Sequence, residues 1–121
     1  MIKLTKTHLI WTLTTLLALP MILAGGAKLA GVEALHQSFQ LIGLPTWFGY
    51  FIGAAELAAG IALFLPRLAA LAALGLIPIM LGATWFHLVY AIPSALPAII
   101  FTLLAAYIAR YRWSTNAIQA I

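Results

Sequence analysis

Four long apolar stretches make up most of this 121-residue chain and constrain its fold more than any other feature. They cover residues 9–28, 47–65, 68–91 and 95–110. Allowing for tilt, each is about long enough to cross a hydrocarbon core roughly 30 Å thick. A backbone in lipid must satisfy its own hydrogen bonds, so such stretches are expected to be helices. The sequence therefore predicts an all-α polytopic membrane protein, a four-transmembrane-helix bundle that forms a single membrane domain over residues 1–121.

The composition agrees with a lipid environment. Hydrophobic residues make up 65% of the chain and charged residues 7%, whereas a soluble domain carries about 25% charged residues. The net charge of +4 is confined to the chain ends and one loop, so we expect the lipid bilayer and no nucleic acid as a partner. No cysteine is present, which excludes dithiol chemistry, thiolate metal sites and iron–sulfur ligation by this chain alone. We expect no metal site.

The basic residues predict an orientation in the membrane. If the four stretches alternate in direction, the side opposite the termini carries only Lys28, together with the acidic Glu33. By the positive-inside rule both termini are then cytoplasmic, as expected for the cytoplasmic membrane of a bacterium or archaeon. The side with the termini carries the other five basic residues: Lys3, Lys6, Arg67, Arg110 and Arg112.

Two segments outside this pattern need separate interpretation. The small residues 24–27 follow the first apolar run and a basic N-terminus, so a cleavable signal peptide remains an alternative to a first span. The connection at residues 31–45 is the only long one, and its apolar residues recur every three or four positions. This spacing predicts a short helix lying flat on the outer surface, with Val32, Leu35, Phe39 and Ile42 on its apolar face.

Glu56 lies in the middle of the second apolar stretch, where a carboxylate costs roughly 2.5–3.5 kcal/mol on insertion scales. Gly49, Gly53 and Gly60 share its helical stripe, and small residues let helices approach closely in lipid. We therefore expect Glu56 to point into the bundle. On the third stretch Gly75 is expected to pack in the same way, as is Gly82.

Lys28 is the expected partner of Glu56. At about 1.5 Å per residue the two Cα atoms differ in depth by roughly 10 Å, and side chains lean toward the N-terminus of their own helix. Lys28 then leans into the membrane while Glu56 leans toward it, which predicts a buried or water-bridged ion pair. The pair has two interpretations, a structural lock between two helices and a functional site.

His87 is the third candidate for a polar site in the outer half. It could carry protons or hold a ligand head group, although an ordinary interfacial histidine explains it equally well. Three aromatic residues expected at a similar depth could stack on a ligand, namely Tyr50, Trp85 and Tyr90. No catalytic residue is assigned, because no phosphate loop, nucleophile elbow or metal-binding motif is present.

Several short motifs occur in an order that resembles the DoxX-like family of small four-span membrane proteins. They are GGAKLAG at residues 25–31, GAAELAAG at 53–60, and GA followed by HL at 82–88. The resemblance implies a four-helix bundle with Lys28, Glu56 and His87 at signature positions. Some relatives are described as membrane subunits of quinone-linked oxidoreductases, and most have no assigned activity.

Three functions remain open from the sequence. The first is a membrane component of a redox system that binds a quinone or similar lipophile; it would have no intrinsic cofactor and would need a redox partner protein. The second is a small proton-coupled transporter, which the one-sided basic residues disfavour because an antiparallel dimer needs an even charge balance. The third is a non-catalytic assembly or scaffold protein. A homo-oligomer is compatible with all three.

Overall fold

The computed structural model describes the backbone of residues 2–90 and 94–120, and the side chains of residues 5–90 and 94–116. All regular structure in these ranges is helical, which confirms the all-α prediction. The third predicted stretch ends at residue 91, which lies outside the described residues. The helices are α1 (Ile2–Leu29), a 3-10 turn η1 (Glu33–Leu35), α2 (Gln37–Leu41), α3 (Thr46–Ala62), α4 (Pro66–Tyr90) and α5 (Leu96–Ala120).

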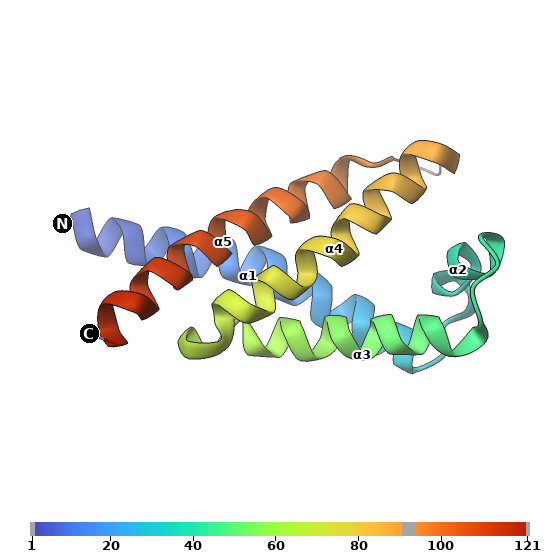
Figure 1. Cartoon of the computed structure of the whole chain (residues 1–121), viewed down its shortest axis with the longest axis horizontal. Helices are drawn as coiled ribbons and strands as arrows, with labels where there is room; N and C mark the ends of the chain where they lie inside the picture. The colour runs from blue at the N-terminus through green and yellow to red at the C-terminus, as the bar shows by residue number, and fades with distance from the viewer. Residues whose placement is uncertain (1, 91–93, 121) are drawn as a thin grey trace.

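The four long helices form two antiparallel pairs, α1 with α3 and α4 with α5 (Figure 1). The first and last described turns lie at one end of the bundle, and α2 lies at the opposite end (Figure 1). The second pair crosses the first and diverges from it toward the α2 end (Figure 1). We call these two ends the terminal end and the α2 end.

Glycines bring α1 and α3 into backbone contact. A Cβ added at Gly25 would lie 2.5 Å from the Leu57 nitrogen, and one at Gly60 would lie 3.1 Å from the Ala18 oxygen. Only residues without a side chain permit so close an approach. The buried residues of α3 are Gly49, Gly53, Glu56 and Gly60, the stripe on which the sequence analysis placed its packing face.

The two glycines predicted to pack on α4 behave differently. Gly75 and Gly82 are both exposed, and an added Cβ would meet no atom within 4 Å at either position. Within the single chain neither glycine lies in close contact with another helix, so their role in helix packing stays a prediction. The inward face of α4 is instead built from larger residues, including Leu76 and Met80.

Two helical segments are long and apolar enough to cross a membrane, Thr5–Leu29 and Pro66–Tyr90. The outward leucines of the bundle are exposed, for example Leu23 at 72% and Leu88 at 66%, which gives the bundle an apolar outer surface. Helix α3 has only 17 residues, and α5 carries two arginines in its second half. The crossing of all four helices therefore stays a prediction.

Arg112 is buried at the terminal end of the bundle, between α1 and α5. Its side chain is 7% exposed, and its guanidinium carbon lies 4.9 Å from the centre of the Trp11 ring. Its Nε and Nη2 atoms have no hydrogen-bond partner among the described residues. A cation–π contact supplies about 2 kcal/mol or somewhat more in a dry site, whereas burying a charge costs several kcal/mol. The aromatic ring thus offsets only part of the cost.

Candidate functional site: an ion pair in an apolar cavity

The predicted ion pair between α1 and α3 is present. Lys28 Nζ lies 2.6 Å from Glu56 Oε1 and donates a hydrogen bond to it. The Lys28 side chain is 12% exposed and the Glu56 side chain 4% exposed. A Cβ added at Gly53 would lie 2.7 Å from Lys28 Cβ, so the absence of a side chain at Gly53 leaves room for the lysine side chain beside α3. The glycine contacts and the ion pair therefore depend on the same close approach of two helices.

The ion pair opens onto a cavity of about 760 Å³ at the α2 end. The cavity lies where the two helix pairs diverge, with walls from α3, from α4 and from the segment that contains η1 and α2. Lys28 and Glu56 are the only Lys, Arg, Asp or Glu side chains among its lining residues. Four aromatic rings line it as well: Phe39, Phe48, Trp85 and Phe86. Ligand pockets in proteins have this volume and this largely apolar lining with a few polar groups.

The cavity brings together four of the six side chains that the sequence singled out. His87 and Trp85 line it together with Lys28 and Glu56. Tyr90 stacks on Phe86, with ring centres 4.8 Å apart, but does not itself line the cavity. Tyr50 lies outside it as well, in a smaller pocket.

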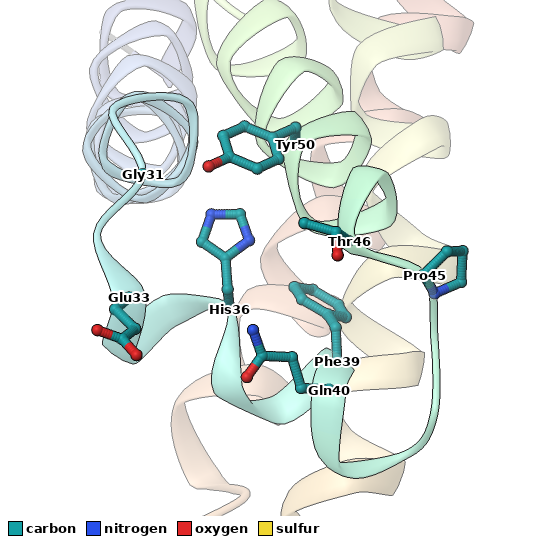
Figure 2. A pocket seen from close by; sticks show the side chains of 8 residues that line it. All are labelled: Gly31, Glu33, His36, Phe39, Gln40, Pro45, Thr46 and Tyr50. Atoms are coloured by element: carbon teal, nitrogen blue, oxygen red, sulfur yellow. The ribbon is translucent and has the colours of Figure 1, made fainter.

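His36 is the residue that sequence reasoning missed. It is 7% exposed, and its Nε2 lies 2.9 Å from the Lys28 carbonyl oxygen. Since a carbonyl can only accept, Nε2 carries the hydrogen and donates it. Figure 2 shows the imidazole facing the ring of Tyr50, and the two ring centres are 4.5 Å apart. The carboxylate of Glu33 points away from both rings (Figure 2).

His36 borders a second pocket of about 250 Å³, which is more polar and lies between the segment at residues 31–46 and Tyr50 (Figure 2). Gly49 leaves room for the imidazole, because a Cβ there would overlap His36 Nδ1. His36 and Gly49, the glycine that leaves room for it, are far apart in the sequence, so their contact leaves no local sequence pattern. Only the odd position of a histidine on an otherwise apolar helical face could have drawn attention to it.

The prediction that residues 31–45 are helical is confirmed, but they form two short helices and not one. The segment is helical but breaks at His36 into two short pieces, η1 and α2. Three of the four residues predicted on its apolar face, Leu35, Phe39 and Ile42, line the cavity. The apolar face therefore covers the cavity, and its position on the membrane surface stays a prediction.

The site as a whole carries a donor and an acceptor but no net charge. The Lys28 ammonium has three N–H donors and the Glu56 carboxylate has two acceptor oxygens, and one contact joins them. In an apolar wall such a pair suits a neutral molecule with a polar head better than it suits an ion. Among the described residues, no group of three His, Cys, Asp or Glu side chains comes together to hold a metal.

A sequence model of the DoxX-like family matches residues 12–109 of the chain. The chain belongs to the DoxX-like family. The match includes Lys28, Glu56 and His87 and most of the described bundle, and it identifies a membrane protein of that family. No curated protein and no solved structure shows a significant match to this chain.

Proposed function

We propose that this DoxX-like protein is a membrane component of a redox system and binds a quinone or a similar lipophilic molecule in the 760 Å³ cavity. The observation that carries the proposal is an ion pair in a cavity wall that is largely apolar and aromatic and contains no other Lys, Arg, Asp or Glu side chain. Membrane proteins seldom keep ionisable groups at depth unless these groups pair or act on a substrate. Here Lys28 and Glu56 pair with each other and, in this proposal, also bind the ligand.

The residues that line the cavity contact different parts of the ligand. Lys28 donates a hydrogen bond to a carbonyl oxygen of the ligand, and Glu56 accepts one from a hydroxyl. The rings of Trp85 and Phe86 stack on a flat ligand, and His87 adds a group that can donate or accept. A quinone, when bound, supplies the electron-accepting chemistry. Because the chain has no cysteine, the electrons come from a partner protein.

Titration with decylubiquinone tests the proposal. Trp85 lines the cavity, so a ligand that enters should quench its fluorescence, and replacement of Trp85 by phenylalanine should remove most of the signal. Glu56→Gln should weaken binding about tenfold. Glu33→Gln is the matched control, since it makes the same chemical change at an exposed residue outside the cavity. Equal affinities for the two variants, or no quenching in wild type, would count against quinone binding.

We further propose a four-span topology with both termini cytoplasmic, in a bacterial or archaeal cytoplasmic membrane. It is supported by the basic residues: Lys6 belongs to the first turns of α1, Arg67 to the first turn of α4, and Arg110 and Arg112 to the second half of α5, and these parts of the helices lie toward the terminal end (Figure 1). Because native cysteine is absent, single cysteines can be labelled without background. Gln40→Cys should react with an impermeant maleimide added outside intact cells, and Ser114→Cys should react only after lysis. Labelling of both positions from outside would reject this topology.

A scaffold role is the second candidate, because the ion pair joins α1 to α3 directly. If the pair only fixes the bundle, Glu56→Gln lowers abundance, and exchanging the charges in a Lys28→Glu/Glu56→Lys variant restores it. Loss of quinone binding at normal abundance would reject the scaffold role.

A further inference from the structure

Residues 31–43 form a segment with a glycine hinge at each end. Gly31 has φ +83° and Gly43 has φ +82°, and both values lie in the left-handed region that other residues rarely adopt. Between them lie η1 and α2, neither of which contains a buried residue. Hinges of moving segments are found at a few such loop positions. We call residues 31–43 the cover segment.

The cover segment closes one side of the cavity. Seven of its residues line the space above the ion pair, and Leu35, Phe39 and Ile42 supply the apolar part. The opposite wall is formed by α4, with Trp85 and His87. Movement of the cover segment would therefore widen the access of a lipophile to Lys28 and Glu56 from this end.

One buried side chain attaches the cover segment to both α1 and α3. His36 is the only buried residue between Gly31 and Gly43. Its Nε2 donates to the Lys28 carbonyl oxygen at 2.9 Å, and its ring lies on Tyr50. The other ring contact of the segment to α3 is Phe39 on Phe48, at 5.5 Å between centres. The same histidine thus holds the segment closed and binds the backbone of the lysine that faces the ligand.

We infer that His36 is a positioning residue that latches the cover segment over the cavity, and that release of this latch lets the segment turn on Gly31 and Gly43 to admit the lipophile. The inference rests on the proposed function for the identity of the ligand. The motion itself can be measured without any ligand.

Two variants break the latch in different ways. His36→Ala removes the imidazole ring. Gly49→Ala keeps the histidine in the sequence but puts a methyl group in the space that its imidazole occupies. Gly26→Ala is the matched control, because the same methyl group meets no atom within 4 Å there. If His36→Ala fails to fold, the two glycine variants still decide the question.

Hydrogen exchange measures the latch directly. Amides of residues 33–41 should exchange at least tenfold faster in His36→Ala and Gly49→Ala than in wild type, while amides of α1 and α3 keep their protection. Gly26→Ala should match wild type. Unchanged exchange in the cover segment, or equal acceleration throughout α1 and α3, would overturn the inference.

Binding kinetics link the latch to the cavity. For decylubiquinone, the association and dissociation rate constants should both rise about fivefold in Gly49→Ala, because a looser cover admits and releases the ligand more often. A changed affinity with an unchanged association rate would overturn a gating role. If wild type does not bind decylubiquinone at all, the proposed function fails while the exchange experiment still tests the latch.

Discussion

Each end of the bundle buries a basic side chain, and the two ends treat the charge differently. At the α2 end Lys28 meets the carboxylate of Glu56 at 2.6 Å, beside a cavity. At the terminal end Arg112 lies over Trp11, and two of its nitrogens lack a hydrogen-bond partner among the described residues. The sequence has two acidic residues, of which Glu56 pairs with Lys28 and Glu33 lies in η1. The buried charge thus has a counter-ion at the α2 end and an aromatic ring at the terminal end.

Removing the carboxylate at the α2 end should have the largest effect on stability. Glu56→Gln leaves a buried ammonium without its counter-ion, and breaking such pairs costs about 3 kcal/mol or more. Thermal unfolding in detergent, followed by circular dichroism, measures the loss. Glu33→Gln at an exposed position should change stability by less than about 0.5 kcal/mol.

A double replacement sharpens this result. Lys28→Met/Glu56→Leu removes both charges and should recover most of the lost stability, because apolar residues of similar size replace buried pairs at little cost. If the double variant is as unstable as Glu56→Gln, shape and not charge holds the α2 end together.

Close helix contact beside the ion pair should have the next largest effect. Gly25→Ala places a methyl group 2.5 Å from backbone of α3, which cannot move without separating the helices, so we expect a loss of about 2 kcal/mol. Gly26→Ala, the neighbouring position with open space, should be neutral or slightly stabilising. The same unfolding measurement applies, and equal effects at both positions would show that α1 and α3 can separate freely.

The ion pair could be predicted from sequence because it depends on two quantities that a sequence contains. Residue counts give the depth of Lys28 and Glu56, and helix geometry gives the direction in which each side chain leans. The packing of α3 followed in the same way from the spacing of Gly49, Gly53 and Gly60. The helical elements followed from the apolar stretches.

The remaining features depend on which surfaces meet. Spacing places Gly75 and Gly82 along α4, but it cannot show that a Cβ at either position would meet no described atom within 4 Å. His36 reaches its site only because the chain turns back through Gly31 and Gly43. The cavity itself arises from the divergence of two helix pairs, a property of the whole assembly that no local pattern contains (Figure 1).

Replacing the arginine at the terminal end should give a smaller effect of opposite sign. Arg112→Met removes a buried charge that has only aromatic contacts, so we expect stability to rise by about 1 kcal/mol after the lost cation–π contact is subtracted. Arg110→Met is the matched control on the same helix, since Arg110 is exposed. A loss of stability in Arg112→Met would mean that the membrane or another protein supplies the missing counter-ion, and the contrast between the two ends would then disappear.

The smallest expected effect is that of salt on the ion pair. The Debye length falls from about 10 Å at 0.1 M to about 3 Å at 1 M, but this screening requires mobile ions near the charges. Glu56 is 4% exposed and faces an apolar cavity, so ions have little access to it. The difference in unfolding free energy between wild type and Glu56→Gln should therefore change by less than about 0.5 kcal/mol over this range. A larger decrease would show that water and ions fill the cavity, and the pair would then resemble an exposed salt bridge that contributes little to either stability or ligand selection.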